Sequence, residues 1–237
     1  MKLVPVTLRS SSLKLARYQL VNCYLVAEAD GFTLIDASFG GFENEILDAA
    51  ERAAKPIRRI LLTHAHPDHM GSVDALVSRL GPVEIAACPR SVPLLKLPPD
   101  MSPKPGEPNK PIRNTPGMKS AVTRTLSEGE LCGSLRVIET PGHIPGHLSF
   151  LDERDGTLYA GDAVVGLGGL RIAGHAPWFL SATDAFTWDK EMALASAIKL
   201  LDYPIVRFAT GHGPVREGGI PLLTEVLARR GVNVDRP

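Results

Sequence analysis

Three histidines and an aspartate fall within six residues of this chain, between an apolar run and a stretch with helical spacing. The segment reads Thr63-His64-Ala65-His66-Pro67-Asp68-His69, and it follows Ile60-Leu61-Leu62. A buried strand that leads into a helix would place four potential metal ligands on one connecting turn. Such groups would repel one another or lack partners on an apolar strand end unless a cation neutralised them. The segment therefore predicts a metal site.

Further histidines and an aspartate recur at three places downstream. Residues 140–147 read Thr-Pro-Gly-His-Ile-Pro-Gly-His, residues 160–162 read Ala-Gly-Asp, and residues 210–213 read Thr-Gly-His-Gly. With the first segment, and in this order, they resemble the HxHxDH signature and the later ligand elements of the metallo-β-lactamase superfamily. The resemblance extends over nearly the whole chain. It is specific for the superfamily and says little about the substrate.

The resemblance implies a centre with two divalent metal ions. The ligands would be divided between one cation (His64, His66 and His143), a second cation (Asp68, His69 and His212) and a bridging carboxylate (Asp162). Because the set contains nitrogen and oxygen donors without cysteine, we expect Zn²⁺ first, with Mn, Fe, Co or Ni as alternatives.

This ligand set implies hydrolysis. Two cations about 3.5–4 Å apart can lower the pKa of a shared water enough to give hydroxide at neutral pH. Asp68 is the candidate catalytic residue, since a carboxylate beside that water can take its proton and pass it to the leaving group. We therefore expect a metal-dependent hydrolase in which a metal-bound hydroxide attacks a small ester, lactone or thioester.

Differences from individual branches of the superfamily narrow this expectation. Asp162 stands where true β-lactamases of this fold carry cysteine or serine, so antibiotic hydrolysis is not expected. His66 stands where the diiron oxygen reductases carry glutamate. The chain is most similar to small stand-alone lactonase and glyoxalase II-like members. Three alternatives stay open: a mononuclear-iron sulfur dioxygenase of the same superfamily, a phosphodiesterase, and a non-catalytic metal-binding scaffold.

Five residues outside the ligand set are candidates for supporting the ligands or contacting the substrate. An aspartate at the place of Asp36 resembles the superfamily's group that orients the metal-site histidines, although a plain strand-end acid is the alternative. His147 is a candidate for either role, or an ordinary hydrogen-bonded imidazole. The glycine-rich stretch 164–180 follows the candidate bridging aspartate, and we expect it to line the pocket with His175, Trp178 and Phe179.

The composition limits the partners and the location. Lys plus Arg and Asp plus Glu number 26 each, so the net charge is zero and no nucleic-acid partner is expected. Cys23, Cys88 and Cys132 are odd in number and widely spaced, which favours reduced thiols in a cytoplasmic protein. Charged residues interrupt the early apolar runs, so neither a signal peptide nor a membrane span is expected. We expect a small-molecule substrate, and a homo-oligomer is left open.

Apolar periodicity predicts alternating strands and helices. Strands are expected at 2–8, 19–28, 32–36, 57–62, 83–87, 122–126, 135–139, 148–151, 157–159 and 205–209. Helices are expected at 42–54, 71–80, 184–201 and 221–230. Proline is dense over 89–116, which predicts an inserted loop that is either a lid or a surface loop. We expect a single domain, 1–237, of the α+β class, and the resemblance implies a four-layer αβ/βα sandwich of the metallo-β-lactamase type.

Overall fold

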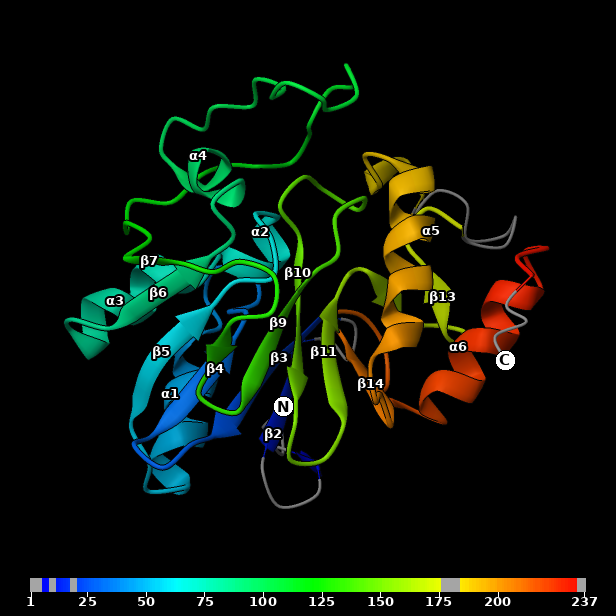
Figure 1. Ribbon diagram of the computed structural model, residues 1–237. Coiled ribbons are helices and arrows are strands. Elements are labelled where there is room, and N and C mark those ends of the chain that lie inside the picture. The colour runs from blue at the N-terminus through cyan, green and yellow to red at the C-terminus, as the bar shows by residue number, and fades with distance from the viewer. Residues whose placement is uncertain (1–5, 9–11, 18–20, 176–183, 234–237) are drawn as a thin grey trace. The chain divides into compact units, whose positions relative to one another are not determined.

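The computed structural model of the chain describes residues 6–8, 12–17, 21–175 and 184–233 (Figure 1). The chain divides into two compact units, one of Met1–Glu107 with Ile112–Ser127 and one of Pro108–Pro111 with Glu128–Pro237. The prediction of a single domain stays a prediction. Trp178 and Phe179 lie outside the described residues. None of the helices in the described part of the chain is long and apolar enough to cross a membrane.

The first unit is built on a seven-stranded sheet whose strands follow one another in chain order. The strands are β1 (Val6–Leu8), β2 (Ser12–Arg17), β3 (Val21–Ala27), β4 (Phe32–Ile35), β5 (Ile57–Leu61), β6 (Glu84–Ala87) and β7 (Arg124–Thr125). Strands β1 to β4 pair antiparallel, and β4 to β7 pair parallel. The carboxyl ends of β4 and β5 therefore meet at one edge of the sheet, where Asp36 and the histidine turn follow them.

Four helices connect the parallel strands of this unit. They are α1 (Glu43–Arg52), α2 (Pro67–Met70), α3 (Val73–Leu80) and α4 (Ser91–Leu95). Helix α1 buries Ile46, Ala49 and Ala50, which share one face at helical spacing. Helices α1 and α3 lie side by side.

The structure corrects two expectations in this unit. Strand β2 was not predicted, although its sequence Ser-Leu-Lys-Leu-Ala-Arg alternates apolar and polar residues as a strand does. Helix α2 begins at Pro67, so part of the ligand turn is helical, whereas the helix was expected to start at residue 71. Proline suits the first position of a helix, because a backbone N–H there would have no partner within the helix. The loop predicted over 89–116 contains one short helix, α4, which admits Pro93 in its first turn. The described residues 96–123 hold no helix or strand.

The second unit contains a six-stranded sheet in the order β15-β14-β11-β10-β9-β8 and a small hairpin. The main strands are β8 (Leu131–Cys132), β9 (Leu135–Glu139), β10 (Leu148–Asp152), β11 (Thr157–Gly161), β14 (Arg207–Thr210) and β15 (Arg216–Glu217), and the hairpin is β12 (Val164–Val165) with β13 (Arg171–Ile172). Strands β11 and β14 are parallel, so the turns that follow them, with Asp162 and His212, emerge at the same edge.

Helices α5 (Lys190–Lys199) and α6 (Gly219–Ala228) and the short 3₁₀ helix η2 (Leu200–Asp202) complete this unit. Ala197 of α5 and Leu223 of α6 belong to one buried cluster with Phe208 of β14, which fixes both helices on the sheet. The helix expected over 184–201 begins later, because Asp189 caps α5 by accepting the N–H groups of Glu191 and Met192.

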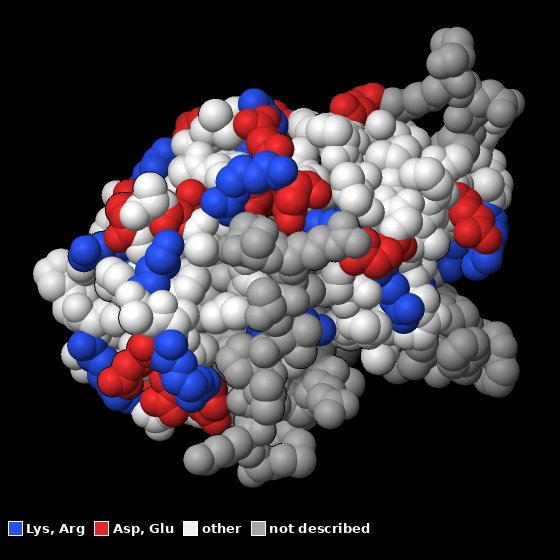
Figure 2. Space-filling view, turned by 90° about the horizontal axis from the view of Figure 1, so that it is seen from below, with Lys and Arg blue, Asp and Glu red and all other residues white. Residues whose placement is uncertain are grey.

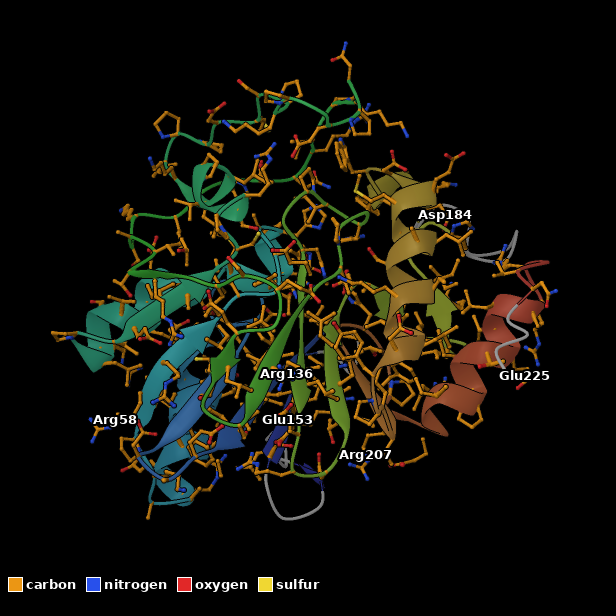
Figure 3. All side chains as sticks on the ribbon, viewed as in Figure 1. Arg58, Arg136, Glu153, Asp184, Arg207 and Glu225 are labelled. Atoms are coloured by element: carbon orange, nitrogen blue, oxygen red, sulfur yellow. The ribbon has the colours of Figure 1, made fainter. Side chains whose placement is uncertain are left out.

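Ion pairs hold the strands of this sheet at the edge away from the candidate ligands. In Figure 3, Arg207 lies at the start of β14, and Arg136 of β9 lies near Glu153, which follows β10. The buried Arg207 guanidinium donates to Thr157 at 2.7 Å and to Asp155 at 3.1 Å. On the face seen in Figure 2, basic and acidic side chains are interspersed rather than gathered by sign.

Candidate functional site

In the first unit, Asp36 organises the turn that carries the three adjacent histidines. Its Oδ1 accepts the Thr63 backbone N–H at 2.8 Å, and its Oδ2 accepts the Thr63 hydroxyl at 2.8 Å and His69 Nδ1 at 2.7 Å. All three residues are buried. Because a carboxylate accepts, His69 carries its proton on Nδ1 and offers the Nε2 lone pair.

The same carboxylate also determines which nitrogen His64 offers. The single proton of the Thr63 hydroxyl is donated to Asp36, so Thr63 Oγ1 can only accept from His64 Nδ1, which lies 2.9 Å away. His64 therefore presents Nε2, like His69. Its Nε2 lies 3.1 Å from His66 Nδ1, and the rings of His64 and His69 are 4.0 Å apart. Nitrogen atoms this close can share a proton or face one cation together.

Asp68 is the most exposed of the four candidate ligands in this unit. It lies in the first turn of α2, with 19% of its side chain exposed, and its Oδ2 is 3.8 Å from His69 Nε2. The carboxylate is therefore partly accessible to solvent, while the histidines beside it are buried.

The loop after β4 packs directly on the histidine helix. Ala37 N–H donates to His69 O at 2.6 Å, and Gly71 N–H donates to Ser38 O at 2.9 Å. A Cβ on Gly71 would lie 2.5 Å from Gly40 N, so only glycine permits this approach. Asp36 and Ser38 both adopt a φ of 58°, a left-handed conformation that is unusual for residues other than glycine. Burial, and then the Asp36 carboxylate, raise the pKa of the nearby Cys23 thiol.

In the second unit, two histidines face a single carboxylate oxygen. His143 Nε2 lies 3.4 Å and His212 Nε2 lies 3.2 Å from Asp162 Oδ2. Asp162 and His143 are buried, and His212 is half-buried. Two imidazole nitrogens and a carboxylate oxygen this close are donors of the kind that bind divalent cations.

Backbone contacts fix the turns that carry His212 and Asp162. Gly211 N–H donates to Gly161 O at 2.7 Å, and Gly166 N–H donates to His212 O at 2.9 Å. A Cβ on Gly166 would lie 2.9 Å from Thr210 Oγ1, so the segment after Asp162 packs closely on the His212 turn. The glycine-rich stretch is thus held in place at Gly166.

The His143 loop is held by residues that sequence reasoning did not select. Trp188 N–H donates to His143 O at 2.9 Å, and Asp189 N–H donates to Gly142 O at 2.8 Å. Lys110, from the proline-rich segment, donates to Asp189 Oδ2 at 2.9 Å and accepts the Trp188 indole N–H through its carbonyl at 3.1 Å. The helix-capping pattern could have indicated Asp189, but no sequence signal links it to Lys110.

The two remaining histidines of the chain have different surroundings. His147 is fully buried, and its Nε2 accepts the Asp162 backbone N–H at 3.0 Å. His175 Nε2 lies 3.1 Å from Lys190 O, to which it donates because a carbonyl can only accept. Its ring is therefore bonded to the start of α5.

Comparison with protein families assigns the chain to one of them. A family model described as "Metallo-beta-lactamase superfamily" matches residues 17–212. This chain belongs to the metallo-β-lactamase superfamily. Members of the superfamily are mostly metal-dependent hydrolases, and this member carries the histidine and aspartate groups that imply divalent metal ions.

Curated relatives of this superfamily member include proteins with and without an assigned activity. It is 42% identical to "Uncharacterized protein YobT" of Bacillus subtilis, over 81% of this chain and 83% of that protein. It is 27% identical to "Probable metallo-hydrolase YflN" of the same species, over 82% and 81%. It is 29% identical to "Atrochrysone carboxyl ACP thioesterase" of Aspergillus fumigatus, over 69% of this chain and 34% of that protein.

Solved structures share the fold of this metallo-β-lactamase superfamily member. BLEG-1 B3 metallo-beta-lactamase superposes with a TM-score of 0.66 at 24% identity, over 90% of this chain and 96% of that chain. TTHA1623 in a di-iron-bound form superposes with a TM-score of 0.60 at 28% identity, over 96% and 98%. The predicted α+β fold class of the metallo-β-lactamase type is therefore confirmed.

Proposed function

We propose that this protein is a dinuclear metal-dependent hydrolase. The observation that carries the proposal is the approach of His143 Nε2 and His212 Nε2 to one oxygen of Asp162, at 3.4 and 3.2 Å, because a carboxylate shared by two cations needs a ligand on each side. The proposed ligands are the seven that family membership suggests: His64, His66, Asp68, His69, His143, Asp162 and His212.

The donor chemistry of these residues fits divalent cations. Asp36 and Thr63 hold the Nδ1 protons of His69 and His64, so both rings offer Nε2 lone pairs without rearrangement. The set suits Zn²⁺, and Mn, Fe, Co and Ni are alternatives, since affinity order alone does not select the metal. Bound cations would supply an acidified water and would polarise the carbonyl of the substrate.

We propose that Asp68 transfers the proton from the attacking water to the leaving group. Its carboxylate is accessible while its helix is fixed by the contacts of His69 and Gly71 with the loop after β4. A carboxylate in this situation can take a proton from the attacking water and release it to the leaving group. Hydrolysis of an ester or lactone needs both transfers, because an alkoxide is a poor leaving group.

Among these substrates we place thioesters first. The support is the thioesterase name of the Aspergillus relative. A thioester also needs less help for its leaving group than an ester does, because a thiol has a pKa near 8.5 and leaves as the thiolate.

Metal analysis and a substrate panel test this proposal. We expect two metal ions per chain and turnover of an S-acyl thioester, measured as released thiol, in preference to lactones, aryl esters and bis-aryl phosphodiesters. Asp162→Ala should lose metal and nearly all turnover, while the control His175→Ala, at a histidine outside the proposed ligand set, should keep its metal. Full metal content with unchanged turnover in Asp162→Ala would refute the dinuclear assignment. One iron per chain with oxygen consumption on a persulfide would replace it with a dioxygenase.

A further inference from the structure

His147 lies outside the proposed ligand set, yet it is bonded at both ring nitrogens. Its Nε2 accepts the Asp162 backbone N–H at 3.0 Å, and its Nδ1 lies 2.8 Å from Thr140 Oγ1. The ring is fully buried. It therefore connects the proposed ligand Asp162 to Thr140, the residue that follows β9.

The direction of these hydrogen bonds can be worked out from both ends. An amide N–H only donates, so Nε2 of His147 accepts and the proton of the neutral ring is on Nδ1. At the other end, Ala160 O only accepts, so the Ser149 hydroxyl donates to it at 3.3 Å. Thr140 then donates to Ser149 Oγ at 2.8 Å and accepts from His147 Nδ1. The Asp162 N–H at one end and the Ala160 carbonyl at the other impose the same donor direction. All four hydrogen bonds can therefore form with only one placement of the protons.

This chain of hydrogen bonds joins the two turns that carry His143 and Asp162. Thr140 N–H donates to His147 O at 2.9 Å, which closes the loop from 140 to 147 with His143 inside it. The His147 ring then holds the amide of Asp162, whose Oδ2 lies 3.4 Å from His143 Nε2. The ring therefore sets the separation of two side chains from different turns.

We propose that His147 is a positioning residue, which holds Asp162 and His143 at the separation needed to bind the same cation. It does so as a neutral ring with its proton on Nδ1, and it touches neither the substrate nor the metal. The proposal rests on the proposed function in one respect, that the group held by Asp162 and His143 is a metal ion. Loss of such a partner behind a ligand typically weakens metal affinity about 10- to 100-fold.

Two amide substitutions separate the two hydrogen bonds of the ring. The side-chain amide of glutamine extends about as far as Nε2 of the histidine that it replaces. His147→Gln can therefore still accept a hydrogen bond from the Asp162 N–H. The amide of asparagine reaches about as far as Nδ1, so His147→Asn can still donate to Thr140 but leaves the Asp162 N–H without its acceptor. Zn²⁺ affinity is measured by competition with a chromophoric chelator, on protein shown to be folded by circular dichroism.

The expected result is a difference between these two variants. We expect Zn²⁺ to bind His147→Gln within about threefold of the wild type and His147→Asn about tenfold or more weakly. His175→Ala, which removes an imidazole that donates to Lys190 O, should bind like the wild type. Equal affinities in the Gln and Asn variants, whether both native or both weakened, would overturn the proposal, because a packing role depends on the ring and not on which amide replaces it.

A second measurement does not depend on any variant. Long-range ¹H–¹⁵N correlation spectra of the metal-free wild type should show the His147 proton on Nδ1, and a proton on Nε2 would overturn the proposal. The outcomes also separate this inference from the proposed function. A wild type that binds no metal refutes both, whereas a wild type that binds two ions with equal affinities in the two variants refutes only the role of His147.

Discussion

Replacing Gly142 with alanine tests how tightly the loop that carries His143 is held. Gly142 has a φ of +133°, and a Cβ there would meet the backbone N and Cα of Ala193 and lie 2.7 Å from its Cβ. These atoms belong to the first turn of α5, whose cap residue Asp189 donates its N–H to Gly142 O. Neither the loop that carries Gly142 nor helix α5 can move away without breaking this hydrogen bond.

A matched control separates the backbone strain from the clash. Gly169 has a similar φ, +112°, but a Cβ there would meet nothing within 4 Å. Alanine in such a conformation costs about 1–3 kcal/mol, so Gly169→Ala should lose about that much free energy of unfolding. Gly142→Ala has the same backbone strain and should lose about 1–3 kcal/mol more free energy of unfolding, because its Cβ is overpacked against a backbone that cannot rotate away.

The assay is thermal unfolding of both variants together with their Zn²⁺ affinity. For a chain of this size each kcal/mol shifts Tm by about 2–4 °C, so Gly142→Ala should melt about 2–12 °C below Gly169→Ala. It should also bind Zn²⁺ more weakly, because displacement of the loop moves His143 from Asp162. Equal melting temperatures for the two variants would refute the reasoning that α5 and the His143 loop are in rigid contact.

Two further predictions concern carboxylates with different tasks. Asp68→Asn should keep most of its metal, measured by plasma mass spectrometry, but lose about 10²–10⁴-fold in kcat, because an amide cannot carry the proton; an unchanged kcat would remove Asp68 from the mechanism. Burial raises the pKa of Asp189, but the hydrogen bonds from Met192 N–H and Lys110 outweigh it, so the pKa lies below its ordinary value. Asp189 thus stabilises the fold above its unfolded pKa of about 3.9, and this stabilisation is lost as the pH falls through the lower folded value. In urea titrations of metal-free protein, the wild type should exceed Asp189→Asn in stability at pH 7 and lose that advantage below about pH 4; a constant difference would contradict the assignment.

Local patterns in the sequence were sufficient to predict most elements of the fold. Strands β4, β5, β9 and β10 match the expected ranges within one residue at either end, because each buries apolar side chains and leads into polar or turn residues. Helix α2 was missed because four residues are too few for periodicity, although Pro67 at its first position was a signal. Strand β2 was missed because its alternating pattern is short and mixes lysine with leucine.

The surroundings of the candidate ligands could be predicted only in part. Motif order suggested Asp36 and His147 as supporting residues, but the sequence could not show which nitrogen each ring offers, since that depends on hydrogen bonds formed in space. Lys110 and Asp189 are separated by 79 residues, and neither belongs to a motif. Their pairing depends on where the proline-rich segment runs, which local propensity does not encode.

The hydrogen bonds of Asp36 also bear on whether the chain folds before it binds metal. Hydrogen bonds with Asp36 and Thr63 orient the rings of His64 and His69. These side chains therefore lose their conformational entropy when the protein folds. The metal then meets a receptor of fixed shape, in contrast to zinc fingers, whose chain is ordered by the ion itself. We therefore expect the metal-free protein to keep these rings in place and to bind the ion without refolding.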